Sequence, residues 1–112
     1  MNIGDIPSVL PCSCAQDVYE DRHLSGGFAG DLLSDVMGKA KADAVLVTVQ
    51  AHRNTIAVAS LAGLAAIVVC HDRPVPEDMV AAARDEGVAV FVTGLDPFEA
   101  SGRLWVALNG QG

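Results

Sequence analysis

The sequence predicts one α/β domain with three layers, α/β/α, in which helices cover both faces of a mainly parallel sheet. Three apolar runs rich in β-branched residues support this prediction, because strands buried on both faces have this composition. The runs are Val45–Val49, Ala65–Cys70 and Val88–Thr93. Helical segments with short connections separate them, and this alternation is typical of βαβ crossovers and parallel sheets.

The length and composition fit a single packed domain over residues 1–112. A chain of 112 residues can bury one core but is too short for two domains. Because 51% of the residues are hydrophobic, we expect a packed globule rather than a disordered chain. The net charge of -7 and the scattered basic residues argue against nucleic acid or an anionic membrane as a partner.

The sequence shows no signal for export or membrane insertion. The start, MNIGDIPSVL, lacks a basic region ahead of an apolar one, so we expect no secretory signal. No apolar run approaches the roughly 18 residues that a spanning helix needs. The three cysteines are an odd number without a framework spacing, which favours reduced thiols and a cytoplasmic location.

The first third of the chain carries weaker signals. Ile3–Leu10 is predicted to form a short helix, in which Pro7 is tolerable only in the first turn. Val18 and Tyr19 suggest a strand in the segment that follows. The next segment, Asp21–Gly30, is predicted to be a glycine-rich connection.

Asp31 is predicted to cap a helix whose apolar stripe is Leu32, Leu33, Val36 and Met37. The glycines ahead of it invite comparison with phosphate-binding loops. The loop lacks the GxxxxGK[ST] pattern, and Asp31 would put a carboxylate where a phosphate must lie. We therefore interpret these glycines as structural, and we predict no cofactor.

The remaining helices have clear start and stop signals. A helix is expected over Asn54–Leu64, with the Asn54 side chain as its N-cap. Glu77 and Asp78 open the next helix, and Gly87 ends it. The last helix begins with Asp96 as N-cap and Pro97 in the first position. It carries the following side chains: Phe98, Leu104, Trp105 and Leu108, with a glycine at 102. We expect the final residues, Gly110–Gly112, to fray.

Polar residues follow two of the predicted buried strands, and we predict a ligand site there. Ligands in open α/β sheets bind at the carboxyl ends of strands, next to helix N-termini that favour anions. The segment after Val45–Val49 supplies four candidates, and the segment after Ala65–Cys70 supplies two more. The candidate residues are Gln50, His52, Arg53, Asn54, His71 and Arg73. The alternative is that Asn54 is only a cap and the others are solvated loop residues.

The cysteines have two interpretations, a metal site or a structural role. Cys12, Cys14, Cys70 and His71 are the candidate ligands. The CxC spacing is not a common zinc spacing, and Cys70 ends an apolar strand where a small hydrophobic residue fits. We therefore predict no metal. His23 has no partner visible in the sequence and is expected on the surface.

The run GGFAGDLLSDVMGKAKADAVLVTVQAHRNTIAVASLAGLAAIVV, with the later VAVFVTG and DPFEASGRLW, resembles a DRTGG domain. This module is similar to the amino-terminal domain of HPr kinase/phosphorylase. The resemblance covers nearly the whole chain and is strongest from Gly26 to Val69. It implies a small α/β/α domain with a regulatory role, of the stand-alone type found with hydrogenase and NADH-linked electron-transfer subunits.

The chain departs from that family pattern in three ways. The name-giving pentapeptide is absent, and Asp21-Arg22 followed by Gly26-Gly27 is the nearest approach. Ala51–Asn54 stands where many relatives have a Gly-Asp-Arg type of turn. The kinase half of the HPr enzyme is missing, so kinase activity does not carry over to this chain.

These observations favour a non-catalytic regulatory module that binds a small anionic metabolite, with an adenine nucleotide as one candidate. The alternative is a protein-interaction subunit of a hydrogenase or other redox complex, without a small ligand. An enzyme ranks last, because no nucleophile–base pair or metal-ligand cluster is visible. We also predict a homodimer, since Phe28, Phe98 and Trp105 exceed what so small a domain readily buries.

Overall fold

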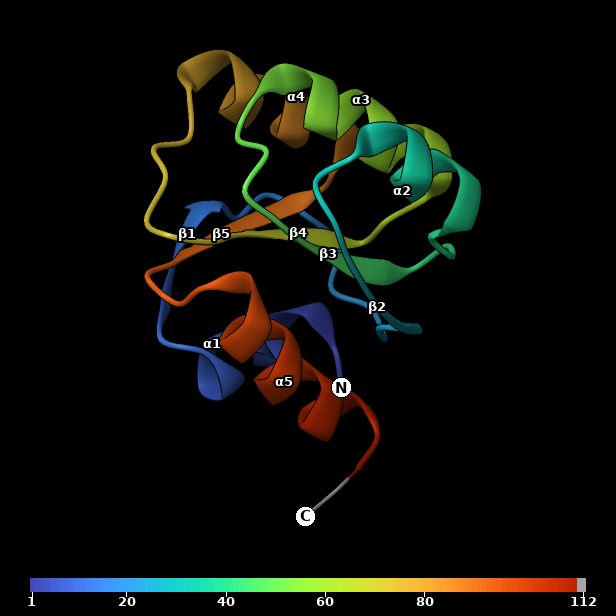
Figure 1. Cartoon of the computed structure of the whole chain (residues 1–112). Coiled ribbons are helices and arrows are strands. Elements are labelled where there is room, and N and C mark those ends of the chain that lie inside the picture. The colour runs from blue at the N-terminus through green and yellow to red at the C-terminus, as the bar shows by residue number, and fades with distance from the viewer. Residues whose placement is uncertain (111–112) are drawn as a thin grey trace.

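The computed structural model describes residues 1–110 and confirms the predicted fold class: a five-stranded, mostly parallel sheet lies between two layers of helices (Figure 1). Gln111 and Gly112, on which the predicted fraying mainly falls, lie outside the described residues. The elements in chain order are η1 (Ile3–Asp5), α1 (Ile6–Val9), β1 (Cys12–Gln16), β2 (Gly26–Ala29), α2 (Leu33–Lys39), β3 (Ala44–Thr48), α3 (Arg53–Ala62), β4 (Ala66–Val69), α4 (Glu77–Glu86), β5 (Ala89–Thr93) and α5 (Pro97–Leu108).

The strand order across the sheet is β1-β5-β4-β3-β2. Strands β2 to β5 are parallel, and each is hydrogen-bonded to the next one along the chain. Strand β1 joins the far side of β5 in the antiparallel direction, with Cys12 opposite Thr93. All four parallel strands therefore end at one edge of the sheet, which we call the carboxyl edge.

Alternate side chains of the central strands enter two separate cores, as the period of two in a strand requires. On β3, Val45 and Val47 pack in the core shared with η1, α1 and α5, whereas Leu46 packs in the core under α2, α3 and α4. Figure 1 shows these two helical layers on opposite faces of the sheet. The three crossover helices α2, α3 and α4 thus share one face, and α5 covers the other.

Several predicted helix ends are confirmed. The helix predicted over Ile3–Leu10 forms in two pieces, the 3-10 helix η1 and the short helix α1, and Pro7 lies in the first turn of α1. Gly87 ends α4 in the left-handed conformation, with φ of 68°, which costs glycine no steric strain. Asp96 caps α5, because its side chain accepts a hydrogen bond from the Glu99 N–H at 2.8 Å, and Pro97 follows at the first helical position.

The two edge strands were predicted wrongly. Strand β1 is Cys12–Gln16, ahead of Val18 and Tyr19, and β2 forms inside the segment predicted to be a glycine-rich connection. Edge strands pair on one side only, so they need less of the apolar, β-branched pattern that marks a central strand. The buried Gln16 helps to fix β1, since its amide Nε2 donates to the Val88 carbonyl at 2.9 Å.

The apolar stripe predicted for α2 is only partly buried. Val36 is fully buried, whereas the side chains of Leu32 and Met37 are 62% and 44% exposed. Helix α2 has seven residues and lies at the end of its layer, so it offers the core little more than one contact position. Within residues 1–110, no helix is long and apolar enough to cross a membrane.

Candidate functional site

Four of the six predicted site residues lie in two loops at the carboxyl edge of the sheet, and the other two, Arg53 and Asn54, begin helix α3. Gln50 and His52 belong to the loop between β3 and α3, and His71 and Arg73 to the loop between β4 and α4. Strands β3 and β4 are adjacent and parallel, and the Cys70 N–H donates to the Thr48 carbonyl at 3.0 Å just beyond their ends. The topology therefore brings both loops to the same edge, as predicted.

Asp31 is the centre of a hydrogen-bond network at this edge. Its carboxylate oxygen Oδ1 accepts from the Thr48 hydroxyl and from the Val49 N–H, each at 2.9 Å. Its main-chain carbonyl accepts from the Gln50 amide Nε2 at 2.8 Å. Asp31 thus joins the loop after β2 to the loop after β3.

The prediction that Asp31 caps a helix is wrong. The residue at the N-cap of α2 is Leu32, and it makes no side-chain cap bond. Because β2 and β3 are parallel neighbours, the end of β3 lies beside Asp31 and offers it a hydroxyl and an N–H. No local pattern around Asp31 indicates this choice, since Thr48 lies seventeen residues further along the chain.

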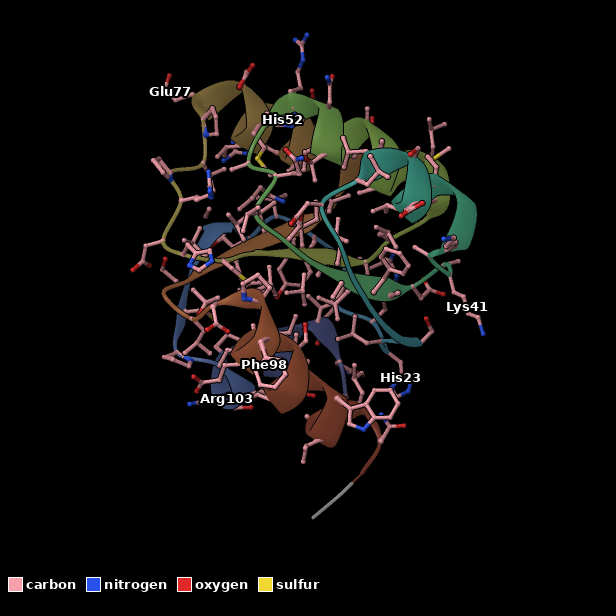
Figure 2. The ribbon with its side chains drawn as sticks, in the orientation of Figure 1. His23, Lys41, His52, Glu77, Phe98 and Arg103 are labelled. Carbon is pink, nitrogen blue, oxygen red and sulfur yellow. The ribbon has the colours of Figure 1, made fainter. Side chains whose placement is uncertain are left out.

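Gln50 holds the loop between β3 and α3 in place. Its side-chain oxygen Oε1 lies 2.9 Å from His52 Nε2, and its own carbonyl accepts from the Thr55 hydroxyl at 2.8 Å. Both ends of the Gln50 amide are therefore engaged within the protein. The structure assigns Gln50 the role of orienting His52, which is half-buried where α3 begins (Figure 2).

The prediction that Asn54 caps the next helix is also wrong. Helix α3 begins at Arg53, the N-cap residue is His52, and no side chain caps it. Asn54 is exposed in the first turn, because the chain enters the helix two residues earlier than the apolar pattern indicates. The first turn of α3 contains no acidic residue, whereas that of α4 contains Glu77 and Asp78.

The loop after β4 makes an unusually tight turn. His71 and Asp72 both have positive φ, 61° and 51°, a conformation that costs a residue with a side chain roughly 1 kcal/mol or more. Their N–H groups donate to the carbonyls of Leu95 and Thr93, at 3.0 and 2.9 Å, and these bonds hold the turn against β5. His71 and Arg73 are consequently displayed as exposed side chains beside the loop that leads to α5.

Carboxylates share the carboxyl edge with the histidines and arginines. Burial raises the pKa of the Cys70 thiol to about 11, and the nearby carboxylates of Asp31 and Asp96 add to this shift. Cys70 therefore stays a protonated thiol near neutral pH and is a core residue rather than a nucleophile. Within residues 1–110, no group of three or more His, Cys, Asp or Glu side chains is arranged to hold a metal ion.

The arrangement of the helices places a crevice beside the loop between β4 and α4 rather than beside the loop between β3 and α3. A crevice opens at the carboxyl edge where successive connections leave for opposite faces of the sheet. Helices α2, α3 and α4 share one face and α5 lies on the other, so the connections that leave the neighbouring strands β4 and β5 go to opposite faces. His71 and Arg73 lie at that switch, and Gln50 to Asn54 lie one strand away.

Two hollows lie apart from the six predicted residues. A cavity of about 470 Å³ lies beside the edge strand β2, where Gly27 and Lys39 face Trp105 of α5. An open hollow of about 1170 Å³ lies along α5, lined by Phe98, Gly102, Trp105 and their neighbours. Neither hollow is lined by a residue of the predicted site.

Comparisons with known proteins bear on the fold. No family model matches the chain, and no curated protein matches its sequence. The structure is similar to a crystal structure of the CBS and DRTGG domains of the regulatory region of Clostridium perfringens pyrophosphatase, complexed with its activator diadenosine tetraphosphate. The TM-score is 0.72 at 12% identity, over 93% of this chain and 45% of that chain. At this identity the likeness establishes a shared fold, and the chain spans less than half of the matched one.

Proposed function

We propose that this protein is a non-catalytic regulatory module that binds a small anionic metabolite, with an adenine nucleotide as the first candidate. The observation that carries the proposal is the start of α3: its N-terminal N–H groups have no side-chain cap, its first turn has no acidic residue, and Arg53 stands in that turn. An uncapped helix N-terminus with a cation beside it favours an anion.

The side chains around this point are available to a ligand. Within residues 1–110, the side chains of Arg53, Asn54, His71 and Arg73 make no hydrogen bond or ion pair, and all four are exposed. The hydrogen bonds from Val49 and Gln50 to Asp31 hold the loop between β3 and α3 in place, so an anion bound there would meet an ordered backbone. Gln50 contributes by orienting His52.

The shared fold supports the regulatory part of this proposal. The matched pyrophosphatase region is regulatory and was crystallised with an adenine-containing activator. We infer that this chain corresponds to the DRTGG part of that region, in line with its sequence pattern. The similarity to HPr kinase, the homodimer and the association with hydrogenase or electron-transfer subunits stay predictions.

The test is ligand-induced thermal stabilisation of the full chain by AMP, ATP and diadenosine tetraphosphate. A ligand at 100 times its Kd stabilises a protein by about 2.7 kcal/mol, which for a domain of this size raises Tm by roughly 10 °C. We expect such a rise in the wild type and its loss in Arg53→Ala and Arg73→Ala. Arg84→Ala is the matched control, because Arg84 is an exposed arginine in the last turn of α4, at the other end of that helix.

Two outcomes would contradict the proposal. If no nucleotide raises Tm, the adenine nucleotide is wrong, and inorganic tripolyphosphate then shows whether the site takes phosphate alone. If a rise persists in both arginine variants, the ligand binds elsewhere on the chain.

A further inference from the structure

Helix α5 carries a second apolar face that the chain itself leaves uncovered. Ala100 and Leu104 are buried against the sheet, whereas Phe98, Trp105 and Val106 are 90%, 67% and 47% exposed. Positions 98, 102, 105 and 106 recur at helical spacing, so they form one stripe on the outer side of the helix. We call Phe98, Gly102, Trp105 and Val106 the α5 stripe; Phe98 lies on the front of α5 in Figure 2.

Gly102 forms a notch at the middle of the α5 stripe. A Cβ atom added there would meet nothing within 4 Å, so no packing within the chain explains the glycine. Glycine inside a helix costs about 1 kcal/mol relative to alanine. The open hollow of about 1170 Å³ lies along this face, and small residues allow the backbone of another element to approach closely.

We propose that a second copy of this chain docks on the α5 stripe, with the two α5 helices antiparallel about a two-fold axis near Gly102. Phe98 precedes Gly102 by about 6 Å along the helix axis, and Trp105 follows it by about 4.5 Å, from a rise of 1.5 Å per residue. Both lie on the same flank of the stripe. A two-fold axis therefore brings Phe98 of one copy over the partner's Trp105, and the same contact repeats on the other side.

The charges flanking the stripe are also self-complementary. On the other flank, Arg103 forms an ion pair with Glu99 one turn earlier in its own chain. In an antiparallel pair centred on Gly102, each Arg103 lies about 3 Å along the axis from the partner's Glu99 and equally far from the partner's Arg103, so the two Glu99–Arg103 pairs meet as one cluster without net charge. The stripe itself contains no charged residue, so the net charge of -7 does not concentrate at the contact.

The size of the apolar contact indicates a reversible dimer. Burial of the four aromatic side chains removes on the order of 600 Å² from water, since each can bury roughly 150–250 Å². Specific interfaces bury about 1,200–2,000 Å² in total, so the stripe supplies the centre of the contact and its polar surroundings the rest. This inference does not depend on ligand binding at the carboxyl edge.

Sedimentation of the full chain over a range of concentrations, from low micromolar to a few hundred micromolar, tests the proposal. We expect a monomer–dimer equilibrium for the wild type. Trp105 is the only tryptophan, so its emission should shift to shorter wavelength as the dimer forms. Gly102→Leu should weaken the dimer at least tenfold, because its side chain fills the notch while the monomer has room for it.

Gly38→Leu is the matched control, because Gly38 is also an exposed helical glycine with nothing within 4 Å of an added Cβ. It should leave dimerisation unchanged. Glu99→Arg and Arg103→Glu should each weaken the dimer, and the double variant should restore it. A monomer at every concentration overturns the proposal, and so does a dimer that Gly102→Leu leaves intact; an apolar helix of another protein would then be the occupant to seek.

Discussion

Replacing Asp31 by alanine should destabilise the protein by about 2 kcal/mol. The carboxylate accepts two hydrogen bonds at 2.9 Å, from the Thr48 hydroxyl and the Val49 N–H, and bonds to a charged group contribute roughly 1.5–3 kcal/mol each when shielded from solvent. Asp31 is exposed to solvent, which weakens both hydrogen bonds, so we expect the two together to contribute about 2 kcal/mol. Loss of a simple helix cap would cost only about 1 kcal/mol.

The assay is urea denaturation with an unchanged m-value, combined with a double-mutant cycle between Asp31→Ala and Thr48→Val. The hydrogen bond predicts a coupling of roughly 1 kcal/mol between these positions. Asp35→Ala is the control, because Asp35 forms only an exposed pair with Lys39 at 3.7 Å and should cost less than about 0.5 kcal/mol. A coupling of zero would refute the role given to Asp31.

Two further predictions concern Cys70 and catalysis. The folded-state pKa of the Cys70 thiol, about 11, lies above its ordinary value of 9.0, so the unfolded chain releases this proton first as pH rises. The contribution of this thiol to the free energy of unfolding is complete below pH 9 and is lost between pH 9 and 11. Over that range the free energy of unfolding should fall by roughly 1 kcal/mol per pH unit. Urea titrations of Cys70→Ala should not show this fall. An unchanged slope in the variant would show that other groups cause the loss. Purified protein with labelled ATP and magnesium should show no hydrolysis or phosphoryl transfer, because the chain lacks the GxxxxGK[ST] loop and Asp31 is held in hydrogen bonds beside β3. Turnover that disappears in Asp31→Ala would contradict this.

The central part of the fold could be predicted from the sequence, because its signals are local. Val45–Val47 and the other buried strands are apolar on both faces, and Gly87 and Asp96 lie at helix ends as their conformational preferences dictate. Strand β2 could not be predicted, since two glycines carry no strand signal and the strand forms only because β3 lies beside it.

The sequence predicted where the two polar loops lie, but it did not predict the hydrogen bonds that hold them. Placing two polar loops at one edge follows from parallel strands alone. The partners of Asp31 and the true start of α3 depend on which strand ends become neighbours, which neither Asp31 nor Asn54 encodes locally. The composition indicated an excess of aromatic side chains, but it could not tell that Phe98 and Trp105 would be exposed and Phe28 partly buried, because a helix with two apolar faces does not reveal which one meets the sheet.

The division of the helices between the two faces of the sheet also sets the order in which the two cores are completed. Each of the strands β2 to β4 packs against the next strand in sequence, and each of the helices α2 and α3 packs against the next helix, so this part of the fold closes only short loops. The other layer joins the two ends of the chain: the Thr93 hydroxyl donates to the Pro11 carbonyl 82 residues away. The core cluster that contains Ile3 and Ile6 also contains Phe91 of β5 and Leu104 of α5, so during synthesis on a ribosome it is complete only after α5 has emerged. The N-terminal segment therefore keeps apolar side chains only partly covered through most of that synthesis.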